Sequence, residues 1–307
     1  MRGNLLKAIF FKLISALLFA VMSAQVRYLG DIVPVGQLVF FRSASAIIPV
    51  VLIYAWRGEL MTAVRTSRPL GQLGRGTLSV IGMFSNFGAL ARLPLADATA
   101  ISFASPLITV ALAAVVLKER VRVYRWSAVG VGFVGVIVML LPHLDVGRHA
   151  GATEASAVGA LLAFGSAFCN AGTVIQTRRL TQSESTSSIV FYFSLICALV
   201  SLVTLPFDWH SPTWKELGML MSLGILGGIA HLFLTESYRF ATASLVAPFD
   251  YSSMLWALIL GFWFFGEVPT ILVFVGAGIV AGAGLYVIWR ERQLGLARAA
   301  EGTPTAT

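Results

Sequence analysis

The side chains of this sequence that could bind a polar molecule are ionisable and amide groups placed inside long apolar stretches. Arg42 lies in the stretch 34–56, and Asp250 lies in the stretch 243–265. A charge near the centre of a bilayer costs about 2.5–3.5 kcal/mol on insertion scales, so such a residue usually has a purpose. With a helical rise of about 1.5 Å per residue, Arg42 lies about 12 Å from one end of its helix and Asp250 about 10 Å from one end of its own. In a hydrocarbon core about 30 Å thick, both fall close to the midplane.

Two interpretations of Arg42 and Asp250 are open at this point. They face a central cavity, where they bind polar parts of a substrate or pair with each other, or they bond to helix carbonyls and fix the packing. Phe249 and Tyr251 flank Asp250. Aromatic rings beside a buried polar group suit a flat, partly polar ligand that stacks on them, although aromatic residues are also ordinary packing residues of membrane helices.

Two asparagines complete the candidate substrate-binding residues. Asn86 and Asn170 lie midway along apolar stretches and at roughly corresponding places in the two halves of the chain. They either line the same cavity or make interhelical hydrogen bonds worth about 0.6–2 kcal/mol each.

Four further residues would suit proton coupling or gating in a protein that moves a molecule across a membrane. His231 belongs to the residue type that titrates near neutral pH, and Glu236 lies in the same stretch. Either they couple transport to protons, or His231 is a structural histidine and Glu236 pairs locally with Arg239. Pro106 and Pro248 lie inside apolar stretches, where proline removes a backbone donor and kinks a helix. In transporters, such breaks supply hinges or exposed carbonyls near the substrate.

These residues must be positioned by membrane-spanning helices. Hydrophobic residues make up 57% and charged residues 12% of the 307 residues, with a mean hydropathy of +0.84, whereas soluble domains carry about 25% charged residues. A spanning helix needs about 20 apolar residues. Ten stretches qualify: 8–28, 34–56, 72–92, 96–117, 123–141, 155–177, 188–205, 213–238, 243–265 and 268–289. We therefore predict an all-α integral membrane protein with ten transmembrane helices.

Basic residues fall mostly on one side of this predicted topology. Most of the 22 Lys and Arg residues, Lys12 and Arg75 included, are assigned to segments on the side of the N-terminus. Positive charge marks the cytoplasmic side, so we expect a multi-pass membrane protein with both termini in the cytoplasm. Its basic segments should lie near anionic lipid headgroups. Topology thus explains the net charge of +8, and we expect no nucleic-acid partner.

The chain divides into two similar halves. The polar joint 142–154 is the linker between a first repeat at 8–141 and a second repeat at 155–290, and 291–307 is expected to be a disordered cytoplasmic tail. When the chain is aligned with itself, the run from Ser105 to Glu119 lies over the run from Ser253 to Glu267. Because five is an odd number, two five-helix repeats in series face opposite ways, which is a common design of secondary transporters.

The last stretch of each half is rich in glycine, with small-residue pairs at Ala128 and Gly132 and at Gly278 and Gly282. Small residues let helix backbones approach closely in lipid. These two helices are therefore predicted to be packing surfaces or the interface of a homodimer, and not walls of the substrate site.

The chain resembles the drug/metabolite transporter superfamily, specifically its EamA-type ten-helix carriers. The residues that carry the likeness are Phe41-Arg42, the run from Ser105-Pro106 to Glu119, and the run from Ala247-Pro248 to Gly266-Glu267. The resemblance implies that helices one to four and six to nine enclose a central cavity, with helices five and ten peripheral. The second half has no arginine that corresponds to Arg42, so the two repeats differ in function. Within the superfamily the chain is similar to metabolite-uptake members, among them riboflavin and S-adenosylmethionine carriers.

We therefore expect a secondary carrier that moves a small metabolite across the bacterial inner membrane by alternating access, with import of riboflavin or a related nutrient as the first hypothesis. Export of amino acids or drugs, and uptake of S-adenosylmethionine, are the alternatives. No lysine follows a glycine, so the GxxxxGK[ST] motif is absent from the sequence and we do not expect this chain to hydrolyse ATP. Neither HExxH nor GxSxG occurs, so we expect no enzyme, no bound metal and no cofactor.

Overall fold

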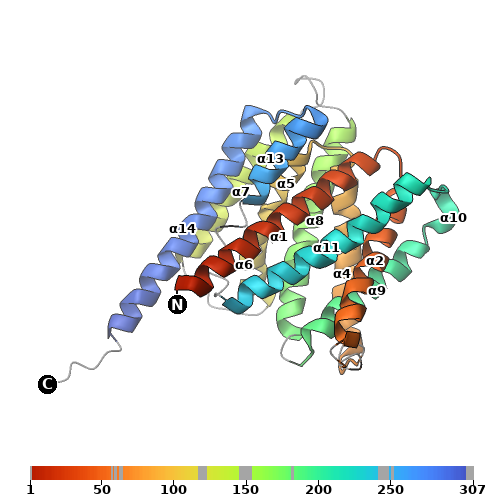
Figure 1. The fold of residues 1–307 in the computed structure, drawn as a ribbon. Coiled ribbons are helices and arrows are strands. Elements are labelled where there is room, and N and C mark those ends of the chain that lie inside the picture. The colour runs from red at the N-terminus through yellow and green to blue at the C-terminus, as the bar shows by residue number, and fades with distance from the viewer. Residues whose placement is uncertain are drawn as a thin grey trace.

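The computed structural model describes residues 2–56, 58, 61, 65–116, 123–144, 154–180, 183–240, 249 and 252–301. Within that part of the chain all regular secondary structure is helical (Figure 1). The helices are α1 (Arg2–Leu29), α2 (Val35–Trp56), α4 (Pro69–Leu90), α5 (Leu95–Ser102), α6 (Ala104–Val116), α7 (Val123–Leu144), α8 (Glu154–Leu180), α9 (Thr186–Leu202), α10 (Leu205–Asp208), α11 (Trp214–Phe240), α13 (Ser252–Phe265) and α14 (Ile271–Glu301).

Seven segments of the described chain are long and apolar enough to cross a bilayer. In lipid every backbone N–H and C=O must find its partner within the structure, which a helix achieves by itself. The class predicted from the sequence, an all-α membrane protein, is therefore confirmed. The seven segments are Leu6–Leu29, Leu95–Val116, Trp126–His143, Glu154–Thr177, Ser188–Phe207, Trp214–Leu234 and Ile271–Arg290, and two shorter apolar helices are Val35–Pro49 and Ser252–Phe265.

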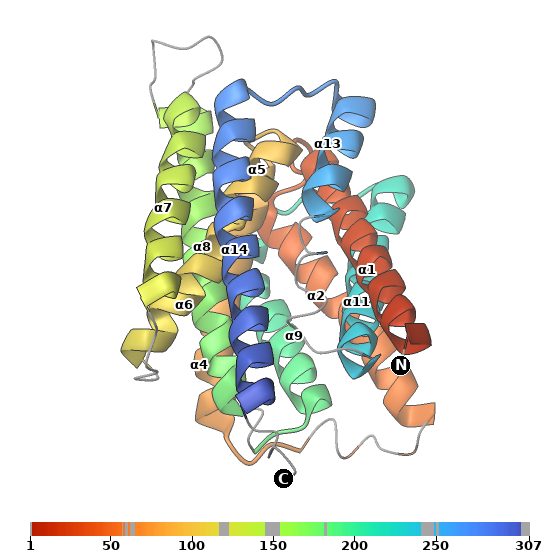
Figure 2. The ribbon, with the colours of Figure 1, turned by 90° about the vertical axis from the view of Figure 1, so that its left-hand side faces the viewer.

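Helices from the two halves of the sequence lie side by side. α1 packs along α11, α4 along α8, α2 along α9 and α7 along α14. Figure 2 shows α14 beside α7, with α1 and α11 together on the other side of the bundle. The first residues of α1 and the last residues of α14 lie at the same end of the bundle, which we call the N-terminal face (Figures 1 and 2). The opposite end, where α1 ends, we call the far face.

The glycine-rich helices α7 and α14 pack against each other within one chain. A Cβ atom at Gly276 would lie 2.5 Å from the carbonyl oxygen of Gly135, and one at Gly135 would lie 2.7 Å from the carbonyl oxygen of Gly276. Only residues without a side chain permit this approach. By contrast, a Cβ at Gly278 or Gly282 would meet nothing within 4 Å. The close contact of these two helices therefore uses Gly135 and Gly276, while the Gly278–Gly282 pair faces away from it.

The fourth apolar stretch is not one continuous helix. α5 ends at Ser102, Phe103 caps it, and α6 begins at Ala104. Pro106 is the third residue of α6 and cannot donate a hydrogen bond to the carbonyl of Ser102, four residues earlier. Proline is tolerated in the first turn of a helix, where its missing N–H costs nothing. The irregularity expected from Pro106 therefore lies one turn before it and divides the segment in two.

Candidate substrate-binding site

An internal cavity of about 170 Å³ lies between α1, α4, α5 and α13. Its wall carries the amide of one predicted residue, Asn86, and the hydroxyls of several serines and one threonine. The lining residues are Phe19, Ala20, Ser23, Asn86, Leu90, Ala98, Thr99, Ser102 and Ser253. Mostly apolar cavities with a few convergent polar groups are the usual form of small-molecule sites. Because α13 belongs to the second half of the chain and the other helices to the first, both halves build it.

Residues spaced three or four apart lie on one side of a helix. On the side of α1 that meets this cavity, several residues at this spacing are polar. Ser23 and Phe19 line the cavity. One turn before Phe19, the hydroxyl of Ser15 donates to the carbonyl oxygen of Ala230 on α11 over 2.9 Å. Lys12 continues this face and is only 3% exposed. The assignment of Lys12 to a basic segment at the membrane surface is thus wrong, because α1 begins at Arg2 and carries Lys12 into the bundle.

The two predicted asparagines take different positions. Asn86 lines the internal cavity. Asn170 is exposed on α8 and does not line it. A role of Asn170 in substrate binding therefore stays a prediction.

Arg42 is buried inside the bundle, as its position in the sequence predicts. It is 5% exposed, and its Cζ atom lies 5.4 Å from the centre of the Phe193 ring on α9. Among the described residues, its Nη1 has no hydrogen-bond partner. α11 passes close by, because a Cβ at Gly224 would lie 2.6 Å from the carbonyl oxygen of Arg42.

Arg75 is a site residue that the sequence analysis missed. It was assigned to a basic loop, but α4 begins at Pro69, so Arg75 lies nearly two turns inside the helix. Its Nε donates to Thr177 Oγ1 over 2.7 Å and its Nη1 to the carbonyl oxygen of Ile189 over 3.2 Å. Its Cζ lies 5.2 Å from the centre of the same Phe193 ring. The signal that could have found it is the proline, which marks a helix start and moves the boundary toward the N-terminus.

His231 on α11 contacts the wall of the internal cavity. Its ring centre lies 5.0 Å from that of Phe19, edge to face. This contact puts a titratable ring next to the cavity, and its role in coupling stays a prediction. Phe249 is partly buried. The other candidates of this region lie outside the described residues: Pro248, Asp250, Tyr251 and the side chain of Glu236.

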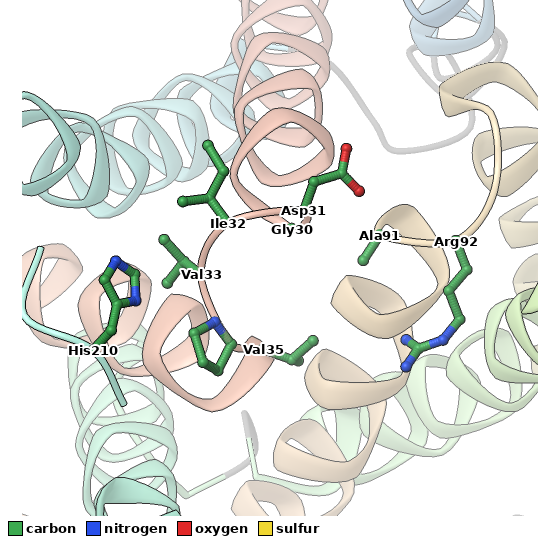
Figure 3. Close-up of a pocket in the computed structure, with 9 residues that line it drawn as sticks. Gly30, Asp31, Ile32, Val33, Val35, Ala91, Arg92 and His210 are labelled. Atoms are coloured by element: carbon green, nitrogen blue, oxygen red, sulfur yellow. The ribbon is translucent and has the colours of Figure 1, made fainter. Parts of the chain in front are cut away.

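A second hollow of about 560 Å³ opens on the far face (Figure 3). It is lined by the turn from Gly30 to Val35, by Ala91 and Arg92 after α4, and by His210. Asp31 and Arg92 bring charges to its rim from different sides (Figure 3). Leu90 lines the internal cavity and the next residue, Ala91, lines this hollow. The last turn of α4 is therefore part of the partition between them.

Glu267, which follows α13, ties three helices together on the far face. Its Oε1 accepts a hydrogen bond from Arg27 Nε over 3.2 Å, and its Oε2 accepts one from the backbone N–H of Leu95 over 2.7 Å. Leu95 is the first residue of α5, so the carboxylate also meets the positive end of a helix dipole. The second half of the chain is thereby fastened to α1 and α5 of the first half, next to the internal cavity.

Glu184 forms a corresponding tie on the N-terminal face. Its Oε1 accepts hydrogen bonds from Thr66 Oγ1, from the backbone N–H groups of Ser67 and Arg68, and from Ser67 Oγ, over 2.7–2.9 Å. Burial raises the pKa of the Glu184 carboxyl, but these hydrogen bonds outweigh it and hold the pKa below its ordinary value. Glu184 lies between α8 and α9 and the residues that it binds precede α4, so this tie also joins the two halves.

The charge of Glu184 is expected to stabilise the fold. A carboxyl with a lowered pKa contributes stability above its unfolded-state pKa and loses it as the pH falls through the folded-state value. At about pH 7, Glu184→Gln should therefore unfold at a lower temperature than the wild type. The difference should shrink below about pH 4.3, the ordinary pKa of glutamate. Thermal unfolding of the detergent-purified protein checks this, with the exposed Glu154→Gln as the control. A difference that stays constant on acidification would contradict the assigned role.

The sequence pattern of the EamA-like transporter family matches residues 6–141 and again residues 157–290. The chain belongs to this family. It is 31% identical to the S-adenosylmethionine uptake transporter of Rickettsia prowazekii (strain Madrid E), over 92% of each chain. It is 30% identical to the riboflavin transporter of Rhizobium johnstonii, over 75% of this chain and 74% of that one. It is 28% identical to the pseudopaline exporter CntI of Pseudomonas aeruginosa (strain UCBPP-PA14), over 91% and 95%.

The fold is also that of a protein of known crystal structure, with a TM-score of 0.65 and 20% identity over 94% of this chain and 98% of that chain. The family match confirms the resemblance to EamA-type carriers. This EamA protein is a multi-pass bacterial membrane transporter and not an enzyme. Among the described residues, no group of three His, Cys, Asp or Glu side chains could hold a metal ion.

Proposed function

We propose that this protein is a secondary carrier that moves a small organic metabolite across the bacterial inner membrane by alternating access. Its ten helices form two inverted five-helix repeats, at 8–141 and 155–290, and its termini are cytoplasmic. The double family match supports the duplication. The helix contacts support it too: the first helix of each half packs on the third helix of the other, as α1–α11 and α4–α8 show. This contact pattern is the same when the first and second halves swap roles, as expected for a duplicated chain.

The observation that carries the proposal is a cavity built by both halves, together with hydrogen bonds that join the halves on each face of the bundle. Ser253 of the second half faces a wall otherwise supplied by the first half. Glu267 joins the halves on the far face, and Glu184 joins them on the N-terminal face. Both ties consist of hydrogen bonds, which exchange readily with water. Opening one tie at a time would expose the cavity first to one side of the membrane and then to the other.

The proposed substrates are nutrients with a flat ring system. The relatives named as S-adenosylmethionine transporters align over most of the chain. The buried Arg42 and the half-buried Arg75 favour a substrate that carries a carboxylate group. Riboflavin, the first hypothesis from the sequence, is the second candidate, and Phe19 and Phe193 suit its ring. The third possibility concerns the direction of transport: the protein exports a metabolite, as its relative named as a pseudopaline exporter does.

Uptake of labelled S-adenosylmethionine and riboflavin tests the proposal. The cells should lack their own carriers for both compounds, and an insertion assay should show equal amounts of protein in the membrane. Saturable uptake of one compound, competed by its unlabelled form, is the expected result. Linear, unsaturable flux would indicate a channel, and flux out of preloaded vesicles without uptake would indicate an exporter. If neither compound crosses the membrane in either direction, both are excluded as substrates.

Neutralising Glu267 should favour the state that is open at the far face. Glu267→Gln weakens two hydrogen bonds that the negative charge assists, each worth about 1.5–3 kcal/mol. In a background with Cys169 and Cys197 replaced, a Ser23→Cys probe in the cavity wall should react with a maleimide from the far side at least about threefold faster. Asp31→Asn is the matched control, since Asp31 also contacts Arg27 but is 68% exposed. Equal labelling rates with and without Glu267→Gln would contradict the gating role.

A further inference from the structure

Two arginines lie inside the bundle against one aromatic ring, and within the described part of the chain no carboxylate pairs with either of them. The Cζ atoms of Arg42 and Arg75 are 5.4 Å and 5.2 Å from the centre of the Phe193 ring. None of the ion pairs found among the described residues includes either arginine. The ring holds the two guanidinium groups by cation–π contact, but it supplies no negative charge.

The two guanidinium groups also keep donors to spare. Arg75 uses Nε and Nη1 on Thr177 and Ile189. Arg42 is 5% exposed, and its Nη1 has no partner among the described residues. A guanidinium has five N–H donors and stays protonated in proteins. Burying such a donor and its charge without a partner is unfavourable, and two like charges near each other add repulsion. The arrangement becomes favourable when an anion arrives.

We propose that Arg42 and Arg75 form an anion subsite that holds a carboxylate of the transported metabolite. This inference rests on the transport function proposed above. Guanidinium groups bind carboxylates with two parallel, charge-assisted hydrogen bonds. Arg42 lies seven residues from the far-face end of α2 and Arg75 six residues from the N-terminal-face end of α4, so both are about 9–11 Å from their helix ends. Anionic lipid headgroups stay at the membrane surface, whereas this depth is that of a carrier's substrate.

α4 connects the anion subsite with the internal cavity. Asn86 comes eleven residues after Arg75, which returns to nearly the same face of a helix about three turns further along. Asn86 lines the cavity, and Arg75 points from that face to Phe193. A substrate with a carboxylate at one end and a neutral, partly polar group at the other matches this order along α4.

The test compares ligands that differ by one carboxylate. Binding of S-adenosylmethionine and of its decarboxylated form is measured by calorimetry on full-length protein in nanodiscs of neutral phosphatidylcholine. The wild type should prefer the carboxylate form by about tenfold or more, since charge-assisted bonds of this kind are strong. Arg42→Gln and Arg75→Gln should each reduce the preference to less than about threefold, while affinity for the decarboxylated form is unchanged. Arg290→Gln, which removes the arginine at the end of the apolar segment of α14, should keep the wild-type preference.

A second measurement does not depend on which metabolite is transported. Sodium acetate supplies a bare carboxylate, and its effect on the thermal unfolding midpoint is compared with that of sodium chloride at equal ionic strength. Acetate should stabilise the wild type and Arg290→Gln more than Arg42→Gln or Arg75→Gln. Two independent variants keep the test valid if one of them fails to fold.

The outcomes separate the subsite from the transport function. One outcome is saturable uptake with equal binding of both ligands and no specific effect of acetate. It would contradict the proposed anion subsite and support the proposed transport function. Specific stabilisation by acetate without any uptake would support the anion subsite and contradict the proposed transport function. If only nanodiscs with anionic phosphatidylglycerol, and no soluble carboxylate, stabilise the wild type over Arg42→Gln, the occupant is a lipid headgroup and the substrate proposal is wrong.

Discussion

Replacing Gly224 with alanine is expected to lower the thermal unfolding midpoint by several degrees and to reduce the yield of folded protein. The new Cβ would lie 2.6 Å from the carbonyl oxygen of Arg42 and 2.7 Å from the backbone nitrogen of Ala46. Both are backbone atoms of α2, so the clash cannot be relieved by rotating a side chain. Overpacking typically costs about 1–3 kcal/mol, and each kcal/mol shifts the midpoint of a protein of this size by about 2–4 °C.

Gly130→Ala is the matched control for this change. It makes the same substitution within a helix, but a Cβ at Gly130 meets nothing within 4 Å. Alanine is also the better helix former, so Gly130→Ala should be neutral or slightly stabilising. Scanning fluorimetry and size-exclusion profiles in detergent measure both variants. If Gly224→Ala is as stable as Gly130→Ala, α2 and α11 are not in the close contact that buries Arg42.

Filling the internal cavity is expected to reduce uptake about tenfold or more without unfolding the protein. Ala20 lines the cavity and is 6% exposed, and leucine at this position adds a branched side chain to a volume of about 170 Å³. The substrate would lose contacts with Ser23 and Asn86 on either side. A loss of about 1.4 kcal/mol in transition-state binding is enough for a tenfold reduction.

The rate of substrate uptake at low concentration, divided by the amount of protein in the membrane, measures this effect. Ala155→Leu is the control, because Ala155 is exposed at the start of α8 and the added side chain enters no cavity. The unfolding midpoint of Ala20→Leu shows whether overpacking has damaged the fold. Normal uptake by a stable Ala20→Leu protein would exclude the cavity between α1, α4, α5 and α13 as the substrate site.

The sequence by itself determined the class of the fold and several of its interior polar residues. Apolar runs of spanning length become helices because lipid offers the backbone no other hydrogen-bond partners. A charge or amide in the middle of such a run is carried inside with it, which is why the positions of Arg42 and Asn86 were predictable. Pro106 predicted a break in the fourth segment, because the backbone N–H that proline lacks is a property of the residue itself and does not depend on the fold.

Only the tertiary structure decided which of these residues meet. Arg42 and Arg75 share Phe193, His231 packs on Phe19, and other long-range contacts tie the halves together. These partners come from helices more than 100 residues apart in the chain. Their meeting depends on how each helix is rotated about its axis and how deeply it docks. Glycine contacts such as that of Gly224 with α2 set that docking, and no local pattern of hydropathy or charge encodes it.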